Sequence, residues 1–140
     1  GEALDERWYD AGNKYALQLS NIYAANSIPV KFRSIGVNPE ARTSLSSDEI
    51  AILAETEHDR WNVEKLLNGF GALPFADRMD ILRGLASPVE EERQAAKKRK
   101  DLLKKESFRH VDIAPYGELA SGSRQYDTDI VTNLLDVIKN

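Results

Sequence analysis

Hydrophobic residues recur at helical spacing along much of the chain. In residues 3–26 they stand three and four positions apart, which predicts an amphipathic helix. We expect this helix to end before Pro29, because the residue that precedes a proline avoids helical backbone angles. Residues 30–36, VKFRSIG, alternate apolar and basic side chains and predict a short strand. The proline and small polar residues of 37–47 predict a loop.

A second helix has clear signals at both ends. Residues 46–49, SSDE, match a capping box in which Glu49 bonds back to the cap, so this helix should begin at Ser46. Asn68 and Gly69 tolerate left-handed backbone and predict its end. The sequence therefore bounds this element more sharply than any other.

The apolar stripe of this second helix contains polar residues. Glu57, Trp61 and Glu64 fall in line with its apolar side chains, and His58 and Lys65 flank them. A buried carboxylate is costly unless it is paired or hydrogen-bonded. Each of these residues therefore has either a structural partner or a function.

The remaining pattern is also helical. Residues 73–85 predict a short helix from about Pro74, and residues 87–90, SPVE, predict a restart with a capping box and a proline at the first helical position. A highly charged helix should follow over 88–105, then an extended loop over 108–123. The last helix, 124–140, should bury Ile130, Leu134, Leu135 and Ile138.

Composition narrows the class of protein. The 140 residues suit one domain, and 41% hydrophobic with 30% charged residues is typical of a soluble globular chain. A net charge of −4 argues against a nucleic-acid partner. The absence of cysteine excludes disulfides and thiolate catalysis and fits a cytoplasmic protein. No apolar run approaches the ~18 residues of a membrane span, so we expect no direct membrane insertion.

Catalytic and metal sites are weakly supported. Glu57, His58 and Glu64 share one helix, but hard-metal sites usually gather more oxygen ligands, so we predict no metal and no cofactor. A catalytic carboxylate pair needs a cleft between two elements, and here both carboxylates lie on one helix. A hydrolase that uses Glu57 or Glu64 is therefore the remote alternative to a protein that is not an enzyme.

The polar residues of the second helix also have structural interpretations. Glu57 and Glu64 would pair with an arginine or cap a loop backbone. The candidate arginines are Arg33, Arg60, Arg109 and Arg124. Trp61 would be either a core residue or the wall of a pocket. The run KKRK at 97–100 is best interpreted as a solvated helix face, and Asp127 and Asp129 as negative charge near a helix start.

Two segments of the chain carry a recognisable pattern, LAETEHDRWNVEKLLNGFG and HVDIAPYGELASGSRQYDTDIVTNLL. Together they resemble the RyR domain, the repeat named after the ryanodine receptor. The matching positions are Leu53, Ala54, Glu57, His58, Trp61, Lys65, Gly69, Phe70, His110, Pro115, Tyr116, Leu119 and Asp127. The resemblance spans about two thirds of the chain.

The resemblance implies a mainly α fold with a few short strands. Residues 46–140 would form the RyR-like domain with a helical hairpin inserted at about 74–105. Residues 1–45 would form an N-terminal helix and connecting arm that packs on this body or on another domain. Because the chain starts with Gly1 and not methionine, we expect a module excised from a longer bacterial protein, channel-linked or signalling, on the cytosolic side.

The resemblance also implies how the two segments meet. The His-Trp face of the first helix would pack under the Pro-Tyr segment, with Glu57 accepting loop N–H groups and His58 meeting Tyr116 or a loop carbonyl. This arrangement would serve a regulatory module that contacts other domains or a protein partner. Alternatively, the same face would bind a small anionic, nucleotide-like ligand. The residues of that site would be Glu57, His58, Trp61, Lys65 and Tyr116.

Overall fold

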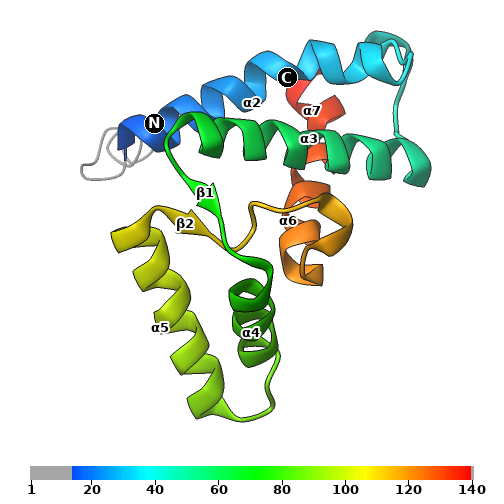
Figure 1. Ribbon diagram of the computed structural model, residues 1–140. Helices are drawn as coiled ribbons and strands as arrows, with labels where there is room; N and C mark the ends of the chain where they lie inside the picture. Colours follow the sequence, from blue (N-terminus) through cyan, green and yellow to red (C-terminus); the bar gives the residue numbers. More distant parts are fainter. Residues whose placement is uncertain (1–13, 140) are drawn as a thin grey trace, which may run out of the picture.

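The computed structural model describes residues 14–139 as a mainly helical chain with one small parallel sheet, which confirms the predicted fold class. The helices are α2 (Lys14–Ser34), α3 (Ser47–Leu67), α4 (Phe75–Leu85), α5 (Glu90–Ser107), α6 (Ser121–Thr132) and α7 (Leu134–Lys139) (Figure 1). The strands are β1 (Gly71–Ala72) and β2 (Arg109–His110), and the short 3-10 turns are η1 (Pro39–Ala41) and η2 (Tyr116–Glu118).

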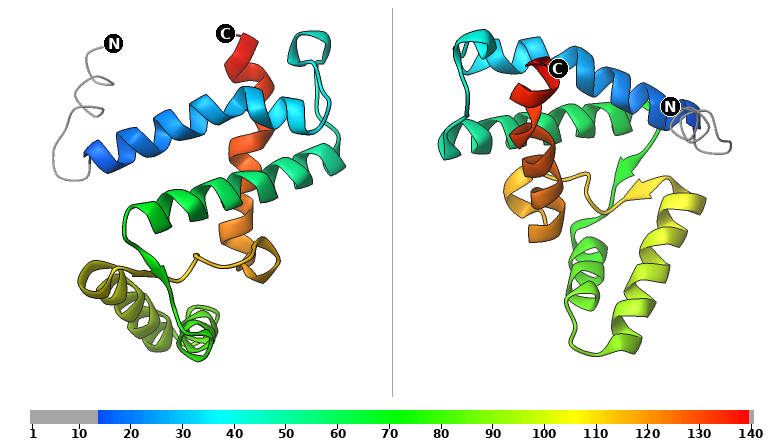
Figure 2. Two further views of the ribbon diagram at one scale, coloured as in Figure 1. Left: turned by 45° about the horizontal axis from the view of Figure 1, so that its top comes forward. Right: turned by 180° about the vertical axis from the view of Figure 1, so that it is seen from behind.

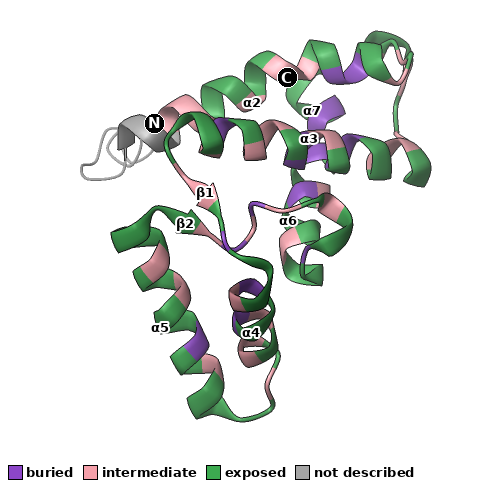
Figure 3. Cartoon of the chain, viewed as in Figure 1, coloured by how far each residue is buried: buried purple, intermediate pink, exposed green. Residues whose placement is uncertain are grey.

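A four-helix body contains the main core. Helices α2 and α3 lie side by side, and α6 and α7 cross behind them (Figure 2). The core residues of the body are Phe32, Leu53, Ala54, Val131, Leu134 and Leu135. Figure 3 shows this burial concentrated where α2, α3 and α7 meet. The segment from α2 to residue 45 is part of this body, and it contributes Ile28, Phe32, Ile35, Val37 and Leu45 to the core.

Two predictions for the N-terminal region are wrong. Helix α2 does not end before Pro29 but continues through it to Ser34, so the predicted strand at 30–36 is absent. Lys31 and Phe32 are both about 2% exposed, and Ile28 and Ile35 pack on the same core. Burial of this helical stripe outweighs the loss of one backbone hydrogen bond at the proline. The first part of the predicted helix, 3–13, lies outside the described residues.

Helix α3 has the predicted ends. Ser46 caps it through the Glu49 N–H, and the Glu49 side chain accepts from the Ser46 N–H, so the capping box is confirmed. At the other end Gly69 has φ +87°. The Gly69 and Phe70 N–H groups donate to the carbonyls of Leu66 and Lys65, which is a Schellman arrangement.

Helices α4 and α5 form a hairpin that projects from the body (Figure 1). It joins the body through β1 and β2, whose register pairs Gly71 with Arg109. Helix α5 begins at Glu90, two residues later than predicted, because Pro88 precedes the cap and the Ser87 hydroxyl accepts the Val89 N–H instead of capping. A separate small cluster of Leu73, Ile81 and Val111 forms the hairpin core.

The predicted last helix is two helices. The chain breaks at Asn133, whose side chain donates to the Asp129 carbonyl and so competes with the regular helical pattern. Leu134 and Leu135 are buried as predicted, but the prediction is wrong for Ile130 and Ile138, which are 38% and 40% exposed because α6 and α7 do not form one continuous helix with a single buried face. Among residues 14–139 we find no helix with the length and apolar character needed to cross a bilayer.

Candidate functional site

The two carboxylates of α3 belong to a buried ionic network. Glu57 is 2% exposed, and its Oε2 lies 2.7 Å from Lys31 Nζ on α2. The Arg60 guanidinium donates to Glu57 Oε1 at 2.8 Å and to Glu64 Oε2 at 2.7 Å. The Ser20 hydroxyl of α2 donates to Glu64 at 3.0 Å. The network therefore joins α2 to α3.

The network keeps Glu57 ionised. Burial raises the pKa of Glu57, but the hydrogen bonds and positive charges of Arg60 and Lys31 outweigh it, so the pKa lies below its ordinary value. Of the four candidate arginines, only Arg60 reaches these carboxylates. The expectation that Glu57 accepts loop N–H groups is wrong, because its oxygens are occupied by Lys31 and Arg60.

His58 bridges α3, the loop and α6. Its Nε2 lies 2.9 Å from the Ala114 carbonyl oxygen, and its Nδ1 lies 3.2 Å from Asp127 Oδ2. Both neighbours are acceptors, so both ring nitrogens carry a proton in this arrangement. Burial lowers the pKa of His58, but the bonds to Asp127 and Ala114 and the charge of Asp127 outweigh it and raise the pKa above 6.5.

The Pro-Tyr segment lies over the His-Trp helix. The Asn62 amide donates to the Ala114 carbonyl at 3.0 Å, beside the bond from His58. The Tyr116 ring centroid is 6.0 Å from that of His58, so His58 meets both the loop carbonyl and Tyr116, as the resemblance implies. Pro115 precedes η2 as its cap residue. These contacts fix the loop.

Asp127 has a different role from the predicted one. The sequence places it near a helix start, but α6 begins at Ser121 and puts Asp127 in its middle, 8% exposed. Its carboxylate faces His58. The earlier start follows from Ala120, which takes the extended cap conformation. Asp129 is exposed and accepts a bond from Gln125.

Trp61 and Lys65 belong to a second cluster, one and two turns beyond Glu57 along α3, and the Trp61 ring also stacks on that of His58 at 5.8 Å. The Trp61 ring is half-buried, and its centroid lies 4.9 Å from that of His110, edge to face. Phe70 contacts both Phe108, at 5.6 Å, and His110, at 6.3 Å. Lys65 Nζ lies 5.6 Å from the Trp61 ring centroid. We call Trp61, Lys65, Phe70, Phe108 and His110 the aromatic cluster.

His110 is neutral within the aromatic cluster. Burial is the main cause that lowers its pKa, to about 4; Asp112 opposes this change, whereas Lys104, Lys65 and Lys100 add to it. Its Nδ1 accepts the Asp112 N–H at 3.2 Å, so the ring proton is on Nε2. The charges that act on His110 are therefore mixed, with three lysines on one side and Asp112, whose Oδ2 lies 3.9 Å from His110 Nδ1, on the other.

The five predicted ligand residues thus divide between two places. Glu57 bonds to α2, and His58 contacts the loop and Tyr116, whereas Trp61 and Lys65 contact the aromatic cluster. The stacked rings of His58 and Trp61 join the two places. Their ligand-binding role stays a prediction. The other matched positions are structural contacts. Leu53 and Leu119 are buried, Gly69 and Phe70 end α3, and His110 begins the loop that contains Pro115.

Sequence reasoning misses three partners. It assigns Lys31 to a strand, although this residue stands on the helical stripe of Ile28 and Ile35. Asn62 carries no motif signal. Arg78 is 3% exposed and donates to the carbonyls of Val111 and Glu118. The sequence signal that could have predicted its burial is its position one turn before Ile81, on an apolar stripe of the helix.

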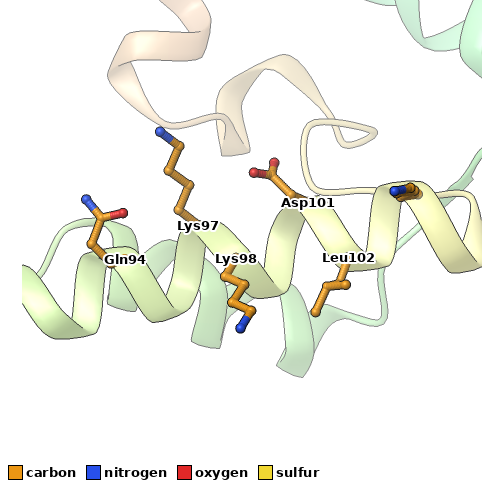
Figure 4. Close-up of a pocket in the computed structure, with 6 residues that line it drawn as sticks. Gln94, Lys97, Lys98, Asp101 and Leu102 are labelled. Atoms are coloured by element: carbon orange, nitrogen blue, oxygen red, sulfur yellow. The ribbon is translucent and has the colours of Figure 1, made fainter.

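The described residues show no cluster of three or more His, Asp or Glu side chains that could hold a metal. They do show two hollows. One of about 340 Å³ lies on the outer face of α5 alone, beside Lys97, Lys98 and Asp101 (Figure 4). Arg99 pairs with Asp77 of α4, so the basic run is a solvated helix face, partly tied to its neighbour. The other hollow lies against α2.

Comparison of the chain with protein-family models, curated proteins and solved structures finds no match.

Proposed function

We propose that the chain is a non-enzymatic RyR-type regulatory module that works through contacts with other domains of a longer bacterial protein, channel-linked or signalling. The observation that carries this proposal is the set of bonds that the buried polar residues of α3 make to other parts of the fold. Glu57 and His58 bond to three other parts of the fold, namely α2, the Pro-Tyr loop and α6. Bonds of this kind hold the parts of the fold in one arrangement, which a module that acts by contact requires.

The burial and the ion pairs of Glu57 and Glu64 argue against the hydrolase alternative. A general acid or base must reach the proton that it transfers, directly or through one water. Glu57 is 2% exposed and holds Lys31 and Arg60, and Glu64 is 5% exposed and holds Arg60. Both carboxylates are engaged in binding cations of the protein itself.

The packing of the Pro-Tyr segment on the His-Trp helix supports the RyR-type part of the proposal. His58 and Asn62 both donate to the Ala114 carbonyl, so one loop oxygen receives two bonds from α3. A carbonyl has two lone pairs and accepts both bonds. The segment therefore has a fixed place on the helix.

A second candidate, a sensor for a small anionic ligand, is favoured by the aromatic cluster. Trp61 and Phe70 offer ring faces, and Lys65, Lys100 and Lys104 place positive charge near His110. Ring faces stack on a nucleobase, and ammonium groups bind phosphate. We place the ligand of this candidate on the aromatic cluster and not against His58.

A thermal-shift screen against nucleotides, cyclic nucleotides and dinucleotide cofactors separates the two candidates. A ligand at 100-fold over its Kd adds about 2.7 kcal/mol of stability. For the contact module we expect no compound to raise the melting temperature. A rise that disappears in Lys65→Gln, but persists in the matched control Lys98→Gln on the outer face of α5, overturns the contact module and supports the sensor.

A further inference from the structure

Helix α2 buries one of its charged residues, Lys31, and exposes several large apolar ones. The sequence contains no charged residue from 15 to 30. The next residue, Lys31, is charged but only 2% exposed, whereas Ile22, Tyr23 and Val30 are 46%, 48% and 56% exposed. Large apolar side chains on the outer face of a helix mark that face as one that a partner can cover.

An apolar groove adjoins this exposed face. It has a volume of about 420 Å³ and lies between α2, the segment that leads into η1, and the end of α7. Its lining residues are Ala25, Ile28, Pro29, Phe32, Arg33, Val37, Pro39 and Ile138. Val137, beside it on α7, is 62% exposed. The outer face of α2 and this groove form one apolar surface, which we call the α2 surface.

We propose that the α2 surface binds a second copy of the same chain, with the two α2 helices antiparallel about a two-fold axis near Asn26. This inference rests on the proposed function of a module that acts through protein contacts, and it identifies one such contact as the contact between two copies of the chain. An uncharged face is matched by a partner face that also lacks charge, because an unpaired charge would lose its water there. The outer side of α2 from residue 18 to residue 30 is such a face, and the exposed Arg33 lies beyond it.

The positions along α2 are self-complementary about Asn26. An antiparallel crossing at this residue sets Ile22 opposite Val30, and Tyr23 opposite Pro29. Pro29 lines the groove, so the exposed Tyr23 ring of one copy faces the hollow of the other. The two Asn26 amides meet on the axis, where each can donate and accept.

The charged ends of α2 do not oppose this arrangement. Arg33 has no hydrogen bond or ion pair with another described side chain, and in the dimer it lies opposite Leu19. The two Arg33 residues would be about 21 Å apart along the helix axis, at 1.5 Å per residue. This separation exceeds the Debye length of about 8 Å at physiological salt, so their repulsion is screened.

Sedimentation equilibrium over a range of concentrations tests the proposal. We expect a mass that rises from the 15.7 kDa monomer to twice that value. Val30→Glu should return it to the monomer, because two carboxylates would be buried at the contact. The matched control is Leu67→Glu at the end of α3, which is 82% exposed and lies off the α2 surface, and it should leave the dimer intact.

The cysteine-free chain allows a test of the axis. An Asn26→Cys variant carries a single thiol, and under mild oxidation it should form a disulfide-linked dimer. Gln125→Cys on α6 should not. A chain that is monomeric at every concentration, or a dimer that persists in Val30→Glu, overturns the inference. Neither result touches the proposed function, which the thermal-shift screen tests separately.

Discussion

The body and the α4–α5 hairpin are stabilised by different interactions. The body buries an ionic network of Lys31, Glu57, Arg60 and Glu64 beside its apolar core. The hairpin has a smaller apolar cluster, and its own ion pairs are at the surface. Buried pairs are costly to break, whereas exposed pairs contribute about 0–1 kcal/mol. The same class of interaction therefore has different weight in the two regions.

The largest expected effect is in the body. Glu57→Gln leaves Lys31 buried without a carboxylate, and breaking a buried pair in this way costs about 3–5 kcal/mol. Asp80→Asn removes the exposed pair with Arg83 in the hairpin and should change stability by less than about 1 kcal/mol. Urea unfolding followed by circular dichroism measures both.

A double variant tests the cause of that loss. Lys31→Met with Glu57→Leu removes both charges and replaces them with apolar side chains of similar volume. Such replacement is often neutral or stabilising. The double variant should therefore be more stable than Glu57→Gln alone. If it is less stable, the loss does not come from an unpaired Lys31.

In the hairpin, the buried charged residue is Arg78 of α4. It donates to the carbonyls of Val111 at 3.0 Å and of Glu118, and to the Glu118 carboxylate at 3.0 Å. Arg78→Met leaves the buried Val111 carbonyl without this donor, which costs about 1–3 kcal/mol. Hydrogen exchange should locate the loss in α4 and the 111–119 loop, with α2 and α3 unchanged. Equal loosening of α2 would contradict a separate role for Arg78.

The difference between the regions also explains which elements the sequence predicts. The ends of α3 depend on neighbours within five positions, such as Ser46 with Glu49 and Gly69 with Lys65 to Phe70, and the sequence predicts them correctly. The partner of Glu57 is Lys31, on another helix. The sequence misses that pairing because a local rule, the stop at Pro29, is outweighed by burial of Phe32.

The candidate site follows the same division. The resemblance predicts the contact of His58 with the loop, because both segments carry motif residues. For Asp127, the second partner, the sequence predicts a helix start, and only the tertiary packing of α6 brings it to His58. Glu57 and Trp61 lie one turn apart on the same face of α3, and they have different partners because α2 packs at the first turn and β2 at the second. No spacing rule supplies that information.

Close helix packing in the hairpin gives the next prediction. A Cβ on Gly84 of α4 would lie 2.7 Å from the Ala96 Cβ of α5. Overpacking in Gly84→Ala should lower the free energy of unfolding by about 1–3 kcal/mol. The higher helix propensity of alanine should offset up to ~1 kcal/mol of that loss. Gly122→Ala on α6 is the matched control, because nothing lies within 4 Å of its Cβ, and it should be stabilising. Thermal unfolding of both variants checks the contrast.

The smallest expected effect is the pH dependence of stability that comes from His58, and it concerns the body alone. Burial lowers its pKa, but Asp127 and the Ala114 carbonyl, with a contribution from the charge of Asp59, raise it above 6.5. The raised pKa stabilises the fold fully below pH 6.5, and this stabilisation is lost as pH rises through the folded pKa.

His110 acts with the opposite sign in a different pH range. Its folded pKa is about 4, so it destabilises the fold as pH falls from 6.5 toward 4 and has no effect above 6.5. Urea unfolding of the wild type and His58→Gln between pH 6.5 and 8 therefore reports His58 alone among the histidines. The wild type should lose more stability with rising pH than the variant. If stability changes equally with pH in the two proteins, His58 is not an imidazolium held by Asp127, and its charge does not stabilise the body.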